Sequence, residues 1–163
     1  MSASKIKTYV RFVISIVLCQ VAAAIGAFFT TPAIPTWYAS LRKPALTPPN
    51  WLFAPVWTAL YLMMAVSLFL VWNTGPKRRE VRESIVIFCV QLGVNVFWSY
   101  SFFGLQSPAL GLVVILALWL SILISIASFF RVSKIAALFL VPYLVWVSLA
   151  TYLNYSVVML NSS

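Results

Sequence analysis

The chain has 163 residues, of which 63% are hydrophobic, and its 11 lysines and arginines stand against only two acidic residues. A soluble domain has about half apolar residues, so this composition predicts one integral membrane domain over residues 1–163. Nucleic-acid binding is not expected, because the cations lie in short segments between apolar runs and form no basic stripe. The positive charge instead indicates an orientation signal and attraction to anionic membrane lipid.

The residue types present exclude several classes of chemistry. The chain contains no histidine, which excludes histidine ligation of zinc or haem and a histidine general base. Cys19 and Cys89 both fall in apolar runs, where free cysteine behaves as a small hydrophobe. No charged residue lies in the middle of an apolar run, which disfavours an ion-coupled transporter. We therefore expect no metal site, no cofactor and no acid–base catalysis.

Five apolar runs, each long enough to cross a bilayer as a helix, predict an all-α integral membrane protein, a bundle of five transmembrane helices. The expected spans are residues 10–31, 48–72, 84–103, 109–130 and 135–160. A cleaved signal peptide is the alternative for the first span, but signal peptides usually have a shorter apolar run, of about 7–15 residues. Ala22 and Gly26 lie four residues apart in this span, which favours close approach of another helix.

Five spans place the two termini on opposite sides of the membrane. The N-terminal side then carries nine cations, which are Lys5, Lys7, Arg11, Lys77, Arg78, Arg79, Arg82, Arg131 and Lys134. The other side has only Arg42 and Lys43. Because positively charged loops stay in the cytoplasm, this distribution predicts a cytoplasmic N-terminus.

The loop at residues 32–47 is rich in proline and aromatic residues. Proline removes a backbone donor and clashes one turn back, so Pro32 and Pro35 are expected to end the first helix. Thr47 and Pro48 are typical of an N-cap followed by proline in the first helical turn. Pro55 is expected to kink the second helix. Irregular backbone in a membrane needs cover from protein or water, and a lid over a pocket is the simplest arrangement.

Three polar residues of the third span, Gln91, Asn95 and Ser99, follow one another at four-residue spacing. A polar stripe within hydrocarbon faces protein or a ligand and not lipid. The stripe therefore predicts either an interface between helices or one wall of a binding pocket.

Aromatic side chains supply the other part of the predicted site, and they gather on two helix faces. These faces are formed by Trp57 with Tyr61, and by Pro142, Tyr143, Trp146 and Ala150. Trp57 and Trp146, together with Trp98 and a polar Asn95, suit a flat and mostly apolar ligand. The alternative is that tryptophans form interfacial belts, which is our interpretation of Trp72 and Trp119.

Three groups of residues form longer motifs. The first group is Trp37-Tyr38, Leu41, Lys43-Pro44, Thr47-Pro48-Pro49, Trp51, Pro55-Val56-Trp57 and Leu60-Tyr61. The second group is Gln91-Leu92, Asn95, Trp98-Ser99 and Phe102-Phe103-Gly104. The third group is Pro142-Tyr143-Leu144, Trp146, Ala150-Thr151, Leu153-Asn154 and Leu160-Asn161. In these motifs, and over almost its whole length, the chain resembles the TspO/MBR family of tryptophan-rich sensory proteins, translocator proteins and peripheral-type benzodiazepine receptors.

This resemblance implies a five-helix bundle, often a homodimer, with a ligand pocket that opens toward the first loop. The implied ligands are porphyrins such as protoporphyrin IX, haem-type tetrapyrroles, sterols and benzodiazepine-type drugs. The family's pocket positions correspond to Tyr38, Trp57, Asn95, Trp98, Trp146 and Ala150. Our predicted binding set adds Trp51, Tyr61, Ser99 and Pro142.

The chain also departs from the family's pattern. Leu46 stands where many members have tryptophan, so the loop is less aromatic here. No basic residue follows Tyr152, which argues against specific cholesterol recognition of the mammalian kind. The uncharged C-terminal end resembles bacterial members, so we expect a bacterial cell membrane as the location.

The leading hypothesis is a membrane receptor or sensor that binds porphyrins. Arg42 and Lys43 are expected to meet the propionates or, alternatively, lipid headgroups. A second hypothesis is an enzyme for light- and oxygen-dependent porphyrin breakdown, with Trp57 and Trp146 as catalytic candidates. A third is a carrier or channel for apolar ligands.

Overall fold

A computed structural model describes residues 3–161. Within these residues, five helices are long and apolar enough to cross a membrane. They are α1 (Ala3–Ala33), α3 (Asn50–Asn73), α4 (Arg79–Ser99), α5 (Pro108–Val132) and α6 (Lys134–Asn161). The short α2 (Trp37–Ser40) lies in the loop after α1, and the π-helix η1 (Tyr100–Gly104) continues α4. The predicted all-α membrane protein with five spanning helices is therefore confirmed.

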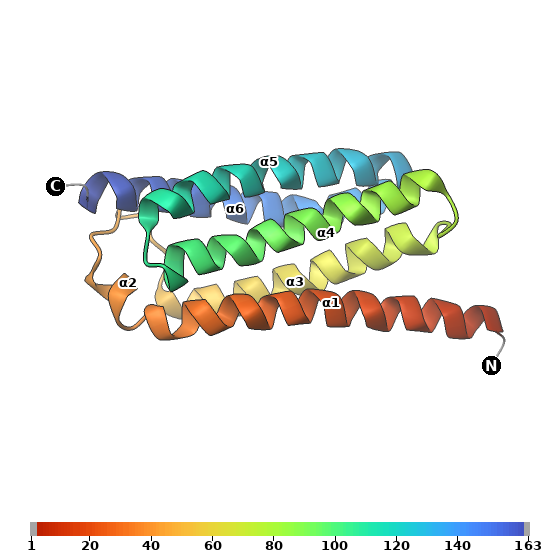
Figure 1. Ribbon diagram of the computed structural model, residues 1–163, viewed down its shortest axis with the longest axis horizontal. Helices are drawn as coiled ribbons and strands as arrows, with labels where there is room; N and C mark the ends of the chain where they lie inside the picture. Colours follow the sequence, from red (N-terminus) through yellow and green to blue (C-terminus); the bar gives the residue numbers. More distant parts are fainter. Residues whose placement is uncertain (1–2, 162–163) are drawn as a thin grey trace.

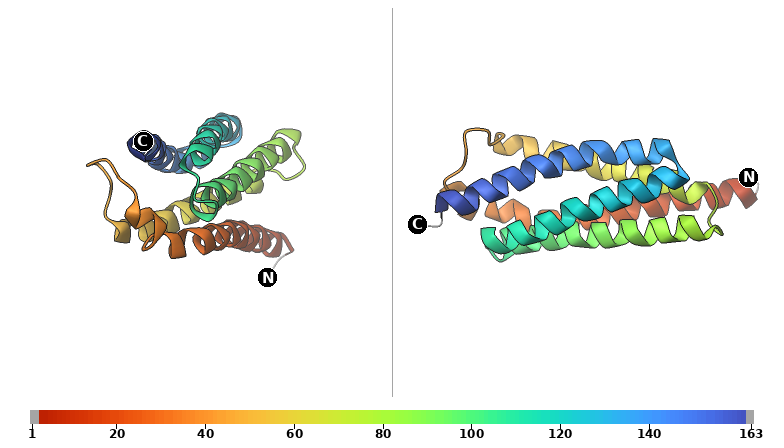
Figure 2. Two further views of the ribbon diagram at one scale, coloured as in Figure 1. Left: turned by 60° about the vertical axis from the view of Figure 1, so that its left-hand side comes forward. Right: turned by 90° about the horizontal axis from the view of Figure 1, so that it is seen from above.

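The long helices lie alongside one another (Figure 1). α1 packs on α3 and α4, α6 packs on α3 and α5, and α4 packs on α5. The helices therefore follow one another around the bundle in the order α1, α3, α6, α5, α4 (Figure 2). The N-terminus lies at one end, near the connection from α3 to α4, and the C-terminus lies at the other end (Figure 1).

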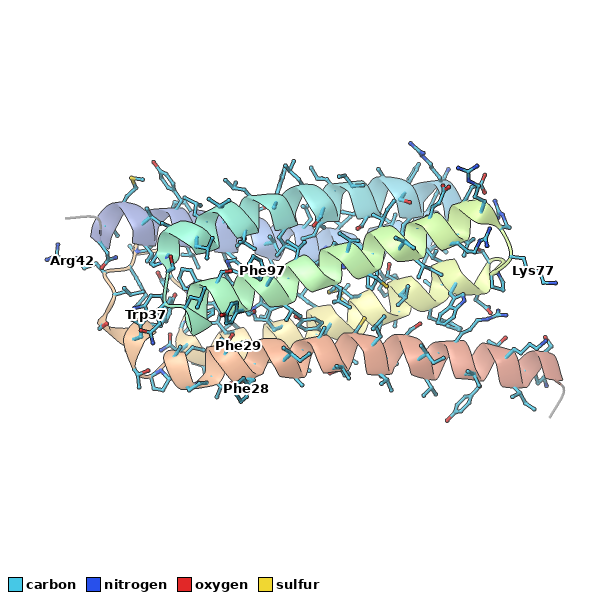
Figure 3. The ribbon with its side chains drawn as sticks, viewed as in Figure 1. Phe28, Phe29, Trp37, Arg42, Lys77 and Phe97 are labelled. Carbon is cyan, nitrogen blue, oxygen red and sulfur yellow. The ribbon has the colours of Figure 1, made fainter. Side chains whose placement is uncertain are left out.

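Apolar side chains cover the outside of the bundle as well as its interior. The largest fully buried side chains include Tyr143, Phe88, Phe129 and Met64. Other apolar side chains project outward along the bundle (Figure 3). Phe28 on α1, for example, is 75% exposed. An apolar outer surface of this extent suits the hydrocarbon of a bilayer.

Gly26 brings α1 close to α4. A Cβ atom at this position would lie 3.3 Å from Ser99 Oγ and 3.8 Å from the hydroxyl of Tyr61. Ala22, one turn earlier, is also buried. The close approach predicted from these two small residues is thus present, and it is the usual way in which membrane helices pack tightly.

The helix ends around the loop differ from those predicted. α1 continues through Pro32 to Ala33, and Ile34 still donates its backbone N–H to the carbonyl of Thr30 at 3.1 Å. α3 begins at Asn50, so the predicted N-cap at Thr47 is wrong. The Thr47 hydroxyl instead donates to the carbonyl of Pro44 at 2.7 Å. Pro49 follows Pro48 and keeps it extended, which delays the start of the helix.

The end of α4 is wound more loosely than a continuous α-helix would be. Over η1, Leu105 donates its backbone N–H to the carbonyl of Tyr100 at 2.8 Å, a bond that spans five residues. Such π-turns are rare and are frequent at functional sites. Phe102 and Phe103 in this turn are both buried. The turn thereby aims two aromatic side chains into the bundle just beyond the predicted polar stripe.

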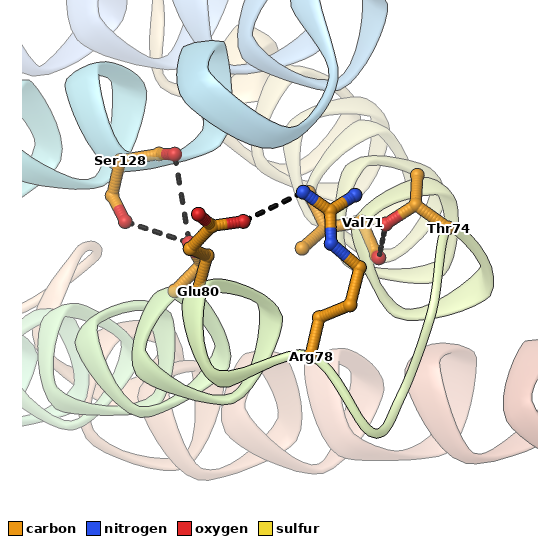
Figure 4. Close-up of polar contacts among 6 residues, drawn as sticks. Val71, Thr74, Arg78, Glu80 and Ser128 are labelled. Carbon is orange, nitrogen blue, oxygen red and sulfur yellow. Dashed lines mark hydrogen bonds and ion pairs between the residues drawn. The ribbon is translucent and has the colours of Figure 1, made fainter.

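The end of the bundle that carries the N-terminus is the more strongly charged one. Arg78 pairs with Glu80 and Arg79 pairs with Glu83, each at 2.6 Å, and all four side chains are largely exposed. Exposed pairs of this kind contribute little to stability. Close by, the Ser84 and Ser128 hydroxyls lie 2.7 Å apart and join α4 to α5 (Figure 4).

The contact of α5 with η1 requires a residue without a side chain at Gly111. A Cβ atom there would lie 2.8 Å from Phe102 Cδ2 and 3.0 Å from Asn154 Oδ1. We expect Gly111→Ala to destabilise the protein by about 1–3 kcal/mol, because the packed core must shift to admit the methyl group. Thermal unfolding of the purified protein in detergent measures this loss.

Gly93 provides the matched control, since among the described residues nothing lies within 4 Å of a Cβ atom placed there. Gly93→Ala is expected to leave the unfolding temperature unchanged or to raise it, because alanine favours helix by about 1 kcal/mol over glycine. Equal loss from both substitutions would contradict the predicted clash at Gly111.

Candidate ligand-binding site

A cavity of about 340 Å³ lies among α1, α3, α4 and η1. This volume falls in the range typical of small-molecule sites. Five of the residues predicted for the site form part of its wall, namely Trp57, Tyr61, Asn95, Trp98 and Ser99. The polar stripe on α4 thus forms part of a cavity wall, which was one of its two interpretations; the other was an interface between helices.

The wall that α1 contributes consists mostly of small side chains. Ala23, Ala24 and Ala27 lie along it, followed by Thr30 and Thr31. Their spacing of three and four residues places them on one face of the helix. The space that these short side chains leave empty is the cavity itself.

Aromatic rings form the opposite wall. The rings of Trp57 and Trp98 lie 6.2 Å apart and are tilted by 33°. Tyr61 lies 5.8 Å from Trp57, and Phe103 of η1 meets Trp98 edge-on at 5.9 Å. Several rings that present their faces and edges to one space suit a flat, apolar guest.

A chain of buried polar groups supports this wall from behind. The Tyr61 hydroxyl donates to Asn95 Oδ1 at 3.2 Å, and Asn95 Nδ2 donates to the Tyr143 hydroxyl. The Tyr143 hydroxyl in turn donates to Gln91 Oε1 at 3.2 Å. These bonds join α3, α4 and α6. They fix the orientation of the Asn95 amide, because both of its ends are engaged.

Trp98 is held in place by a second polar chain. Its indole Nε1 donates to Asn154 Oδ1 at 3.3 Å, and Asn154 Nδ2 donates to the carbonyl of Pro108 at 2.7 Å. The same ring also lines a second, much smaller cavity of about 30 Å³. Trp98 therefore stands between the two cavities and is anchored to α5 and α6 through Asn154.

The remaining predicted residues lie elsewhere. Tyr38 and Ala150 line the small second cavity. Trp51 is 71% exposed, and Pro142 is also exposed. Trp146 is half-buried beside Phe53, with ring centres 5.9 Å apart.

The predicted convergence of Trp57 and Trp146 on one cavity is not found, and Phe53 explains why. Phe53 lies one turn before Trp57 on α3 and lines both cavities. Its ring stands against Trp146, which lies outside the wall of the larger cavity. Neither Phe53 nor Phe103 was in the predicted site. For Phe53, the signal available was its spacing of four residues from Trp57.

The loop covers one end of the bundle through Tyr38. This side chain of α2 is buried against Phe53, Phe102 and Phe103, with ring centres 6.4, 6.3 and 5.8 Å away. Burial raises the pKa of the Tyr38 phenol above its ordinary value. The ring therefore stays neutral at physiological pH and acts as an apolar plug under the loop.

Lys43 and Arg42 are engaged in holding this loop. Lys43 Nζ donates to the carbonyls of Tyr38 at 2.6 Å and Leu41 at 3.1 Å, and it lies 4.6 Å from the centre of the Tyr38 ring. The backbone N–H and carbonyl of Arg42 both bond to the Asn161 side chain, at 3.1 and 3.0 Å. The Arg42 side chain itself projects away from the bundle (Figure 3).

The cavity wall is made of uncharged side chains. Among residues 3–161, no charged side chain forms part of the cavity wall. No three potential metal ligands among histidine, cysteine, aspartate and glutamate lie together in the same part of the chain. The contacts available to a guest are aromatic faces, methyl groups and a few polar atoms.

Replacing Tyr143 with phenylalanine tests the buried polar chain. Tyr143→Phe leaves Asn95 Nδ2 and Gln91 Oε1 without their partner in a buried site, and unpaired buried groups are costly. We expect a loss of about 1–2 kcal/mol in the free energy of unfolding, measured in detergent. Tyr61→Phe removes one bond only and should lose less; equal losses would contradict the central place of Tyr143.

Sequence comparisons match the chain to a known family. The model of the TspO/MBR family matches residues 15–160. The tryptophan-rich protein TspO of Chlorobaculum tepidum is 46% identical over 95% of this chain and 98% of its own length. The protein of the same name from Archaeoglobus fulgidus is 41% identical, over 93% of this chain and 97% of its own.

A more distant relative is the human translocator protein, which is 35% identical over 74% of this chain and 72% of its own length. The family match includes every one of the five predicted residues that line the larger cavity. From the extent of that match and these identities, we conclude that the chain belongs to the TspO/MBR family.

Proposed function

We propose that the protein is a membrane receptor whose larger cavity binds a planar, largely apolar ligand of the porphyrin type. Membership of the TspO/MBR family supports a membrane sensor or translocator role. The observation that carries the finer proposal is that Trp57 and Trp98 both line one cavity, with ring centres 6.2 Å apart.

The shape of the cavity supports a flat ligand. Its wall runs from Gln20 on α1 to Ile34, the residue just after the end of that helix, which is about 21 Å at the helical rise of about 1.5 Å per residue. One side of this space is bounded by small side chains and the other by aromatic rings. A planar molecule lying between them stacks on indole and meets alanine methyl groups on its other face.

Receptor function fits the site better than photochemical breakdown by a pair of tryptophans. The two catalytic candidates, Trp57 and Trp146, do not line one common cavity, because Phe53 stands against Trp146. We infer that a bound ligand contacts Trp57 and Trp98 directly. The expected homodimer stays a prediction.

Replacing Trp57 with leucine tests the binding proposal. Trp57→Leu keeps an apolar side chain and removes the aromatic face, which contributes about 1 kcal/mol beyond its buried area. Protoporphyrin IX affinity, measured by quenching of the remaining tryptophan fluorescence, should fall about fivefold or more. The control is Trp51→Leu, because Trp51 is 71% exposed and lies outside the cavity wall. Unchanged affinity in Trp57→Leu would reject this cavity as the site.

We also propose that the end of the bundle with the N-terminus faces the cytoplasm of a bacterial cell. Lys77, in the connection from α3 to α4, lies at this end (Figure 3). Because positively charged loops are retained on the cytoplasmic side, the cations of this connection support the proposed orientation.

Cysteine labelling measures this orientation in a Cys89→Ala background, where the remaining Cys19 is buried. In intact spheroplasts, a membrane-impermeant maleimide is expected to label Ala45→Cys, on the loop, and to label Arg78→Cys only after lysis. The opposite pattern would reverse the orientation.

A further inference from the structure

We propose that Gln20 selects, among flat apolar ligands of the larger cavity, those that carry a hydrogen-bond acceptor such as a ketone, quinone, ester or amide carbonyl. This inference rests on the proposed function, since it assumes that the cavity binds a ligand. It adds the chemical class of that ligand and the residue that recognises it.

Gln20 is the first residue of the cavity wall on α1, at the end farthest from the loop. Its Nε2 atom is buried and, within residues 3–161, has no hydrogen-bond partner. Ala23, Ala24 and Ala27 follow it on the same helix face and reach no further than a methyl group. A buried amide N–H without a partner is destabilising. An acceptor brought in by a ligand removes this penalty.

Three other amide, indole and phenol donors of the wall are already engaged. The Tyr61 hydroxyl donates to Asn95, Asn95 Nδ2 donates to Tyr143, and Trp98 Nε1 donates to Asn154. Some hydroxyl groups of the wall are also engaged, because they donate back to a carbonyl of their own helix. Thr30 Oγ1 donates to the carbonyl of Gly26 at 2.9 Å.

Thr58 repeats this pattern on α3. Its Oγ1 donates to the carbonyl of Ala54 at 2.8 Å. The Thr58 hydroxyl is therefore less available to a ligand than Gln20 Nε2, although both residues line the cavity. Thr58 thus gives the control for Gln20: a polar side chain in the same wall whose donor is already used.

The position of the cavity opening favours a ligand that arrives from the hydrocarbon. The exposed residues of its wall are small and belong to α1 and α3, and they include Ala24, Ala27, Ala54 and Thr58. Gln20 lies 13 residues before the end of α1 at Ala33, which is about 20 Å along the helix. At this depth bulk water is absent, so the Gln20 donor discriminates strongly between a carbonyl and a methylene group.

The experiment uses two probes of nearly the same shape, 1-acetylpyrene and 1-ethylpyrene, which differ in one carbonyl oxygen. Binding to the full-length protein in detergent is measured by energy transfer from tryptophan to pyrene. The variants are Gln20→Leu, which keeps the side-chain volume and removes the amide, and Thr58→Val, which removes the engaged hydroxyl. Dividing each variant's affinity by that of the unmodified protein cancels the partition of each probe into detergent.

We expect Gln20→Leu to weaken 1-acetylpyrene about fivefold, as for one neutral hydrogen bond, and to leave 1-ethylpyrene unchanged or bound more tightly. Thr58→Val should change neither. Retained binding of 1-ethylpyrene shows that the Gln20→Leu cavity is intact. If Gln20→Leu weakens both probes equally, or neither, the assignment to Gln20 is wrong while the cavity remains a binding site. If Trp57→Leu weakens the binding of neither probe, the proposed function fails together with this inference.

Discussion

The Asn95 side chain joins α3, α4 and α6, of which α3 and α4 line the larger cavity. It accepts a hydrogen bond from Tyr61 on α3 and donates one to Tyr143 on α6, while its own backbone belongs to α4. Lipid surrounds the outside of such a bundle, so apolar side chains alone specify few of its contacts. A fully engaged amide in hydrocarbon has few alternative partners, and this makes the relative placement of α3, α4 and α6 specific.

The cavity follows from this constraint and from the small side chains of α1. Gly26 lets α1 approach Ser99 closely, while the alanines on the neighbouring face leave space in front of Trp57. Because most polar groups around that space are bonded to the protein itself, we expect recognition to depend on shape, on stacking and on the buried Nε2 donor of Gln20. Such a combination suits the binding of apolar molecules.

Much of the site was predictable from residue spacing. The stripe of Gln91, Asn95 and Ser99 was expected to face protein or ligand, and all three side chains are buried. Phe103 could not be predicted, because the π-turn that aims it inward depends on packing of η1 against α1 and α5. The start of α3 was also misplaced, since two successive prolines delayed it to Asn50.

The sequence by itself determined that this is a membrane protein with five helical spans, because each span must satisfy its own backbone groups in hydrocarbon and needs a long apolar run to do so. It also determined which side chains share a helix face. Only the tertiary structure decided which faces meet. Trp57 and Trp98 line one cavity, whereas Trp146 lies beyond Phe53. Helical periodicity gives the direction of a side chain from its own axis, but the neighbour that it meets depends on how the other helices pack.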